Sequence, residues 1–345
     1  MRSNVRAACG SIDPVVSFTS TAASVVVGST VAAQILLMAT PTSTDASADS
    51  FKAGICSILG LPNVGKSTLL NALIGEPLSI VTPKPQTTRQ RLLGIYSDER
   101  HQAVFVDTPG LLEPRYALHE SMRAEAERAR IDADVIVYVV DVGWTPSVEH
   151  AEAFLPVCSV PSILCLNKAD RVADEDLAAI EERLTGDKEW QLAVATVATR
   201  RQGIETLRLS IIELLPDSPP LYPVDEIATA PVRFFAAELI RETCFEELSE
   251  EVPYATAVEI DAFRESSDPV FISAFIYVER ESQKGIVIGR GGSMIKDIGR
   301  KSRLKIEKLI DRPVFLDLRV KVMANWRRRP GRLKLLGYNL PSRPR

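Results

Sequence analysis

Apolar and polar positions occur in blocks along the chain, and the blocks predict two different domains. From Phe51 to about Pro216, short apolar runs are separated by amphipathic stretches. Apolar runs of this length indicate buried strands, and amphipathic stretches indicate helices. Such strands suit a sheet covered by helices on both faces, so this part predicts an α/β domain with a mostly parallel sheet. The expected strands are 54–59, 90–97, 102–107, 135–141, 162–166 and 192–197, and the expected helices are 67–74, 122–130 and 204–214.

A second pattern begins after a proline-rich joint. Prolines at 216, 219, 220 and 223 mark a domain boundary, with a linker predicted at 217–230. From Val314 to Val322 apolar and polar residues alternate, which predicts a half-buried strand. The order helix, two strands, helical segment, helix, strand predicts a smaller α+β domain over 231–340, after a first domain over 51–216. Its expected helices are 233–248 and 293–310, and its expected strands are 254–263, 270–279 and 314–322.

Residues 1–50 form a leader that differs from the rest of the chain. Between Met1 and Thr44 the charged side chains are Arg2, Arg6 and Asp13, and Ser, Thr, Ala and Val dominate. A Ser-rich leader poor in acidic residues is typical of a cleaved organellar transit peptide. Because arginine is scarce, we expect import into the chloroplast stroma, with the mitochondrial matrix as the alternative. The uncharged span 14–44 is long enough to cross a bilayer, but its many hydroxyl side chains make a membrane anchor the less favoured interpretation.

The charge of the chain is divided unevenly. The formal net charge is −4, yet residues 281–345 contain 18 Lys/Arg against 5 Asp/Glu, a net of +13. A basic C-terminal segment on an acidic body favours a polyanionic partner. The five cysteines are scattered and the three histidines are isolated, so we expect neither a disulfide framework nor a Cys/His metal site.

The segment from Gly60 to Thr68 matches G-x-x-x-x-G-K-S/T, a glycine-rich turn whose backbone N–H groups surround a nucleotide phosphate. It follows the predicted strand 54–59 and leads into the predicted helix 67–74, so a helix N-terminus faces the anion. The segment therefore predicts the phosphate site of a kinase, an ATPase or a GTPase.

Three further segments select GTP. Asp107–Gly110 ends an apolar strand, where its carboxylate can hold Mg²⁺ through water and a glycine N–H can approach the γ-phosphate. Asn167–Asp170 ends another strand, and the Asp170 carboxylate can accept hydrogen bonds from N1 and the exocyclic N2 of guanine, which adenine does not offer. In Pro85–Arg89, a threonine hydroxyl can complete the Mg²⁺ shell when the γ-phosphate is present.

The basic second domain contains its own motif. Val287–Lys296 carries G-x-x-G between two helical segments, which resembles a type II KH domain, a clamp for about four nucleotides of single-stranded RNA. Trp326 and the three arginines after it fit either an extension of the RNA surface or a packed ring with a solvated tail, and we leave both open. The expected RNA-binding residues are Lys284, Gly289, Arg290, Gly291, Gly292 and Lys296.

From about Phe51 to about Tyr338 the chain resembles the Era-type GTPases of the TrmE–Era–EngA–Septin-like group. The resemblance is carried by Pro62–Asn71, Pro85–Arg91, Asp107–Gly110, Asn167–Asp170 and the segment around Gly289. It implies a site for GTP or GDP with Mg²⁺, in which Lys66 contacts the β- and γ-phosphates. The implied nucleotide-binding residues are Gly60, Pro62, Asn63, Val64, Gly65, Lys66, Ser67, Thr68, Asp107, Thr108, Pro109, Gly110, Asn167, Lys168, Asp170 and Ala198.

The resemblance also implies which residues act in hydrolysis. Ser67 would ligate Mg²⁺ directly and Asp107 through water, and Thr88 is favoured over Thr87 as the third ligand. Lys66, Thr88 and Gly110 are the expected catalytic residues. Leu111 stands where other GTPases place a water-orienting glutamine, so intrinsic hydrolysis should be slow, and we expect Asn63 to coordinate a stimulating K⁺.

One segment departs from the family pattern. The guanine-supporting loop aligns only as Val197-Ala198-Thr199, which keeps the Ala198 N–H for guanine O6 but lacks the usual bracing serine. We therefore expect a loosened loop and weaker nucleotide affinity.

The resemblance implies a GTP-hydrolysing switch that binds the 3′ end of 16S-type rRNA during assembly of the small ribosomal subunit, with the pre-30S-type particle as partner. Two alternatives remain at this point. One is a membrane-associated GTPase anchored by the leader, and the other is an RNA-binding module whose nucleotide site is degenerate.

Overall fold

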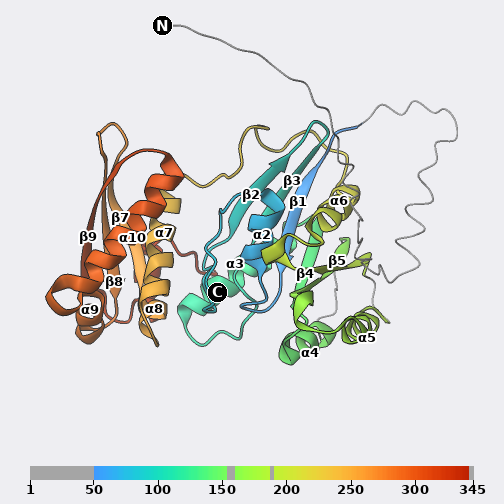
Figure 1. Ribbon diagram of the computed structural model, residues 1–345, viewed down its shortest axis with the longest axis horizontal. Coiled ribbons are helices and arrows are strands. Elements are labelled where there is room, and N and C mark those ends of the chain that lie inside the picture. Colours follow the sequence, from blue (N-terminus) through green and yellow to red (C-terminus); the bar gives the residue numbers. More distant parts are fainter. Residues whose placement is uncertain (1–49, 154–159, 187–189, 342–345) are drawn as a thin grey trace, which may run out of the picture. The chain divides into compact units, whose positions relative to one another are not determined.

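The computed structural model describes residues 50–153, 160–186 and 190–341 (Figure 1). The predicted leader, with both its transit-peptide and its anchor interpretation, lies outside these residues apart from Ser50. Within the described ranges, no helix is both long enough and apolar enough to cross a membrane.

The first part of the chain folds around a six-stranded sheet with the order β2-β3-β1-β4-β5-β6. Neighbouring strands pair in parallel, except that β2 and β3 are antiparallel. The sequence therefore predicted the fold class correctly, including the neighbouring pair of strands. The strands are β1 (Lys52–Leu59), β2 (Leu92–Ser97), β3 (His101–Asp107), β4 (Val135–Asp141), β5 (Ser162–Asn167) and β6 (Leu192–Thr196).

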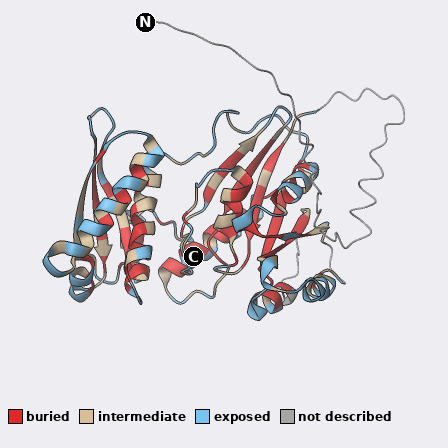
Figure 2. Ribbon diagram, in the orientation of Figure 1, coloured by how far each residue is buried: buried red, intermediate tan, exposed pale blue. Residues whose placement is uncertain are grey.

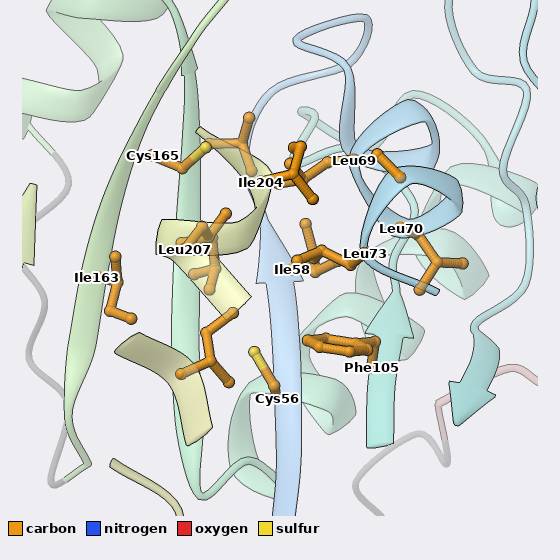
Figure 3. Close-up of a cluster of buried hydrophobic side chains, with 14 of the residues drawn as sticks. Cys56, Ile58, Leu69, Leu70, Leu73, Phe105, Ile163, Cys165, Ile204 and Leu207 are labelled. Carbon is orange, nitrogen blue, oxygen red and sulfur yellow. The ribbon is translucent and has the colours of Figure 1, made fainter. Parts of the chain in front are cut away.

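Helices cover both faces of this sheet because its strands are apolar on both sides. In Figure 2 the central strands are buried along most of their length. In β4, Val135, Val137 and Val139 belong to one buried cluster, whereas Ile136, Tyr138 and Val140 belong to another. Figure 3 shows the first cluster, in which Leu69 and Leu73 of one helix and Leu207 of another meet Ile58 of β1. The helices are α2 (Lys66–Ile74), α3 (Ala117–Ile131), α4 (Thr145–Ala153), α5 (Asp174–Thr185) and α6 (Ile204–Leu214).

The second part of the chain has its own sheet and core. The sheet order is β7-β8-β9, with β7 antiparallel and β9 parallel to β8. A separate cluster that includes Ile240, Ile272 and Ile298 fills the space between the sheet and its helices. The elements are α7 (Val232–Glu247), α8 (Val252–Ala255), β7 (Ala257–Arg264), β8 (Val270–Val278), α9 (Glu281–Ile288), α10 (Ser293–Ile310), β9 (Val314–Val322) and α11 (Pro330–Leu335).

Several elements differ from the sequence prediction. The strand expected at 254–263 begins only at Ala257, because Pro253 lies in the first turn of the short helix α8, where its missing N–H costs nothing. The helices α4, α5 and α11 were not predicted. Three acidic residues in the first turn of α5 were a usable signal for that helix, since negative charge is favourable at a helix N-terminus.

The predicted linker is bound to the edge of the first sheet. Ala228 forms an isolated bridge with Gly94 of β2, and the Ile95 N–H donates to the Ile227 carbonyl. The buried Gln102 amide accepts from the N–H groups of Leu221 and Tyr222. The bonds at Gly94 and Ile95 satisfy backbone groups of the edge strand β2, which would otherwise be open for pairing, and those to Gln102 attach the linker to β3.

Candidate functional site

The turn Gly60–Thr68, called the phosphate loop below, depends on glycine at two places. Gly60 has φ +145°, and a Cβ there would lie 2.4 Å from the Val139 carbonyl oxygen. Gly65 has φ +103°, and a Cβ there would lie 2.3 Å from Nδ2 of Asn167. The loop therefore packs directly against the ends of β4 and β5, which brings it beside the guanine-binding segment predicted from the sequence.

Lys66, the first residue of α2, is 5% exposed, and its ammonium donates to the carbonyls of Gly60 (3.1 Å) and Leu61 (2.8 Å). Burial lowers the pKa of Lys66 to about 8, and the charge of Asp107 opposes this shift. A buried ammonium held only by carbonyls is suited to a stronger anionic partner, and a nucleotide phosphate is one.

Three side chains predicted as Mg²⁺ ligands meet beside Lys66. The Ser67 and Thr88 hydroxyl oxygens are 2.8 Å apart, and they donate to Asp107 Oδ2 over 2.7 and 3.1 Å. Ser79, which the sequence analysis missed, also donates to this oxygen, over 3.0 Å. No motif contains Ser79, so the sequence carried no signal for it.

The chemistry of this cluster fits Mg²⁺, which prefers oxygen ligands and is commonly held by carboxylates. Burial raises the pKa of Asp107, while the three hydroxyl donors and Lys66 oppose that rise. Its second oxygen, Oδ1, is buried without a hydrogen-bond partner in the described structure. A buried carboxylate oxygen without a donor is costly, and a cation with its water shell would satisfy it. Between the two adjacent threonines, it is Thr88 that lies in the cluster.

The segment from Ser79 to Arg91 joins α2 to β2 and is called the switch loop below. Its residues Thr82, Lys84 and Thr87 line the same hollow as Asn63, Lys66 and Gly110. The loop therefore covers the phosphate site, as expected for a segment that responds to the γ-phosphate.

Gly110 also lines this hollow, and Leu111 follows it in the chain. A Cβ on Gly110 would lie 2.6 Å from the Pro62 nitrogen, so only glycine allows this close approach to the phosphate loop. The Leu111 N–H donates to the Gly60 carbonyl over 3.0 Å, and its side chain packs against the core cluster beneath α4. The residue that replaces the usual glutamine is therefore an apolar side chain packed on the core, with no polar atom to orient water.

The predicted guanine-binding residues converge at the ends of β5 and β6. Asn167 donates to the Val64 carbonyl (2.8 Å), and Lys168 donates to the Asn63 carbonyl (2.7 Å) and to Asp141 (2.6 Å). Asp170 pairs with Arg200 at 3.3 Å. Arg200 is largely exposed, and pairs of this kind contribute little, so a guanine base can replace it.

The expectation of a loosened guanine loop is wrong. Asn167 Oδ1 accepts from the Thr196 hydroxyl (3.1 Å) and from the Ala198 N–H (3.3 Å). Thr196, one residue before the aligned segment, supplies the bracing hydroxyl that Val197 lacks. Thr196 could not be found from the motif, because the motif places the hydroxyl only at the aligned position.

The G-x-x-G motif of the second domain connects α9 to α10. Gly289, Gly291 and Gly292 all have positive φ, at 73°, 59° and 78°. Arg290 and Lys296 are exposed beside this turn. Lys284 lies on α9 near Glu281, at 3.9 Å.

A groove of about 420 Å³ runs between α10 and β9. Its α10 wall carries Lys296, Arg300 and Arg303, whose side chains are exposed, and its β9 wall carries Phe315, which is 56% exposed. Lys284 is not among its lining residues. The sequence analysis missed Arg300, Arg303 and Phe315, although basic residues spaced at helical intervals before an exposed aromatic ring were a usable signal. A basic groove with an aromatic rim fits a single nucleic-acid strand.

Trp326 is packed and cannot extend this surface. It is fully buried among Leu118, Met122 and Tyr338, and its indole N–H donates to the Ala255 carbonyl over 2.8 Å. Arg327 pairs with Glu279 at 2.5 Å. Of the two interpretations left open from the sequence, the packed ring is correct.

The model of a family described as 50S ribosome-binding GTPase matches residues 55–168, and the KH domain model matches residues 251–327. The GTPase Era of Carboxydothermus hydrogenoformans is 40% identical over 297 residues, which cover 84% of this chain and 98% of that protein. The GTPase Era of Stenotrophomonas maltophilia strain R551-3 is 41% identical over 288 residues, which cover 83% of this chain and 97% of that protein.

Two solved structures of Era are similar over the same range. A crystal structure of Era with MgGDPNP and nucleotides 1506–1542 of 16S ribosomal RNA has a TM-score of 0.79 and 38% identity, and covers 84% of this chain and 100% of that chain. A single-substitution variant of Aquifex aeolicus Era bound to GDP·AlF4⁻ has the same score, identity and coverage.

Proposed function

This chain belongs to the Era family of GTPases, and we propose that it is a GTP-hydrolysing switch that binds the 3′ end of 16S-type rRNA during small-subunit assembly. The observation that carries the proposal is the presence, in one chain, of the Ser67–Thr88–Asp107 cluster and the basic groove between α10 and β9. The first gives a nucleotide-sensitive site and the second gives an RNA surface.

In this proposal the residues of the first domain bind and orient GTP. Lys66 leaves the carbonyls of Gly60 and Leu61 and donates to the phosphates, while Asp170 accepts from the guanine edge. Ser67, Thr88 and Asp107 would hold Mg²⁺, which would supply positive charge beside the phosphate oxygens. The chain thereby fixes the nucleotide for attack by water.

Hydrolysis without assistance should be slow. Leu111 packs against the core and has no polar atom to orient water. Asn63 is exposed at the rim of the phosphate hollow with φ 65°, where its side-chain oxygen is available to a monovalent cation. We therefore assign Asn63 to a stimulating K⁺, which would supply positive charge where other GTPases use a glutamine or arginine.

The RNA partner is argued from the groove and from the relative that contains RNA. Lys296, Arg300 and Arg303 can contact phosphates, the glycines of G-x-x-G allow close approach of the backbone, and Phe315 offers a ring for stacking. The related Era structure holds nucleotides of 16S rRNA, which belongs to the small subunit. The precursor of the small subunit is therefore the expected particle.

The description of the matched GTPase family, 50S ribosome-binding GTPase, names the large subunit, so binding to the large subunit is a second candidate. The two candidates, small-subunit and large-subunit binding, are distinguished by crosslinking. The protein is crosslinked to RNA in an organellar extract, the ribosomal particles are separated by sedimentation, and the crosslinked RNA is sequenced. Crosslinks at the 3′ end of small-subunit rRNA are the expected result, and crosslinks confined to large-subunit rRNA would overturn the assignment.

The interpretation as an RNA-binding module with a degenerate nucleotide site is not favoured, because the predicted site residues form a connected network. Turnover of GTP by the wild type that disappears in Lys66→Ala would exclude it. Absence of turnover in the wild type, with RNA binding intact, would instead support it.

For localisation we retain the chloroplast stroma, with a cleaved transit peptide, and keep the mitochondrial matrix as the alternative. The support is the composition of residues 1–50, which is rich in Ser and Thr and poor in Arg. Sequencing of the mature N-terminus from isolated organelles tests it. A soluble protein that begins near Ala48 in the stroma agrees, and an uncleaved chain in carbonate-washed membranes supports the anchor.

A further inference from the structure

Arg89 lies next to Thr88 in the switch loop, yet its side chain enters the second domain. It is 4% exposed, and its guanidinium donates to the carbonyls of Thr256 (2.6 Å) and Tyr254 (3.0 Å). Tyr254 belongs to α8, and Thr256 lies between α8 and β7. A residue beside the magnesium cluster is thus bonded to the domain that carries the RNA groove.

Aromatic rings complete the site around Arg89. The guanidinium carbon is 5.7 Å from the centroid of Phe245 and 5.6 Å from that of Trp326. Burial lowers the pKa of Arg89, while its interactions with Tyr338 oppose the shift. A buried cation is costly unless its donors are satisfied, so the carbonyls and rings form a specific receptor for this side chain.

Lys84 makes a second attachment from the same loop. Its ammonium donates to the carbonyls of Phe245 and of Leu248, the latter over 2.6 Å. These carbonyls lie at the C-terminal end of α7, where unpaired carbonyls attract a cation. The switch loop is therefore attached to the second domain on both sides of Thr87.

These contacts continue to the RNA groove through α7. Lys305 of α10 pairs with Glu242 of α7 at 2.7 Å, and Lys301 pairs with Glu247 at 2.5 Å. Residues of α10 form one wall of the groove. Helix α7 therefore receives Lys84 at its C-terminal end, contacts Arg89 through Phe245 and packs against α10.

We propose that Arg89 is a positioning residue for GTP hydrolysis, which holds Thr88 at the magnesium cluster while its guanidinium occupies the pocket of Tyr254, Thr256, Phe245 and Trp326. Adjacent Cα atoms are about 3.8 Å apart, so the bound Arg89 limits how far the backbone of Thr88 can move away from the cluster. The second domain therefore stabilises the arrangement of the switch loop that GTP requires. By thermodynamic reciprocity, GTP stabilises the arrangement of the second domain that receives Arg89. This inference rests on the proposed function for the link to RNA, but its effect on nucleotide binding does not.

The first test compares the affinities of a non-hydrolysable GTP analogue and of GDP, with Mg²⁺, in the full mature chain. Arg89→Met should weaken binding of the analogue by about tenfold or more. The variant loses the hydrogen bonds of the guanidinium, and these bonds matter for the nucleotide state in which Thr88 is a ligand of Mg²⁺, which is the state with the GTP analogue. Binding of GDP should stay the same. Arg89→Lys should restore part of the difference, since an ammonium retains a charged donor but not the two-pronged geometry.

The matched control is Arg91→Met. Arg91 lies two residues further along the same loop, but it pairs with Asp132 and Glu125 of the first domain. This variant should bind both nucleotides as the wild type does. Equal weakening of both nucleotides by Arg89→Met, or no weakening of either, would overturn the proposal.

A second variant covers the case in which Arg89→Met does not fold, as judged by circular dichroism. Lys84→Met removes the other attachment and should weaken the analogue selectively, and an unchanged ratio of affinities there overturns the proposal. Affinity for an RNA oligonucleotide from the 3′ end of 16S rRNA is measured in parallel. If the wild type does not bind this RNA, the proposed function fails while the nucleotide ratio still decides the role of Arg89.

Discussion

The hydroxyl oxygens of Ser67 and Thr88 lie 2.8 Å apart although 21 positions separate these residues in the sequence. Ser67 belongs to the first turn of α2, whereas Thr88 belongs to the switch loop. Their contact closes the loop over the phosphate hollow and places both hydroxyls on Asp107 Oδ2. The three side chains predicted as Mg²⁺ ligands thus contact one another in this structure.

This contact predicts different effects for two neighbouring threonines. Thr88→Ala should lower kcat for GTP hydrolysis by about 100-fold, because a ligand used in the transition state is lost. Thr87→Ala, the matched control, should have little effect, since Thr88 is the threonine within hydrogen-bonding distance of Ser67 and Asp107. Single-turnover hydrolysis checks both variants. A larger loss in Thr87→Ala than in Thr88→Ala would contradict the assignment.

The nucleotide motifs could be predicted because each is local. Gly60–Thr68, Asp107–Gly110 and Asn167–Asp170 each follow an apolar strand, and parallel strands bring their ends to one edge of a sheet. The sequence pattern of the second domain likewise gave its strand and helix order, with the start of β7 misplaced by the short helix α8.

Contacts between distant segments could not be predicted. Arg89 belongs to the motif Pro85–Arg91, but nothing in that motif indicates its partners Tyr254 and Thr256, which lie 165 and 167 positions away. Trp326 looked equally suited to solvent or core, and only its packing against Leu118 and Met122 decides. Thr196 braces Asn167 through a hydroxyl at a position that alignment by motif passes over.

The buried ammonium of Lys66 predicts a pH dependence for nucleotide binding. Its pKa in the free protein is lowered to about 8, and bound phosphates should raise it again. Binding above that pH must therefore take up a proton, so affinity for GDP should be constant at lower pH and fall as pH rises through about 8, approaching about tenfold per unit. Fluorescence titration up to about pH 8.5 measures the slope, where most of the guanine keeps its N1 proton. Affinity that stays constant across this range would show that Lys66 keeps its proton in the free protein.

Asp170 predicts a change of base specificity. Asp170→Asn replaces an acceptor by a donor facing the exocyclic amine of guanine, so affinity for GTP should fall by about 1,000-fold. Xanthosine triphosphate has a carbonyl at this position and should bind the variant better than GTP does. Competition binding measures the ratio of the affinities for GTP and xanthosine triphosphate. Arg200→Ala serves as the control because it removes only the exposed partner of Asp170. A variant that still prefers GTP would place guanine recognition elsewhere.

Asn63 predicts a dependence on the monovalent cation. Hydrolysis should be faster in K⁺ than in Na⁺ by about tenfold or more, because K⁺ at Asn63 would supply positive charge in a site where Leu111 offers no polar group. Asn63→Ala should have the same slow rate in both salts. Steady-state rates at equal ionic strength check this, and equal wild-type rates in the two salts would remove the role of K⁺.

The central claim is that the nucleotide controls binding of small-subunit rRNA, and its most direct test is the affinity for an oligonucleotide from the 3′ end of 16S rRNA. The full mature chain should bind it more tightly, by about tenfold, with a non-hydrolysable GTP analogue than with GDP. Arg300→Glu, in the groove, should weaken binding in both states, whereas Lys308→Glu, exposed on α10 but outside the groove-lining residues, should change it less. Equal affinity of the wild type in the two nucleotide states would contradict the account.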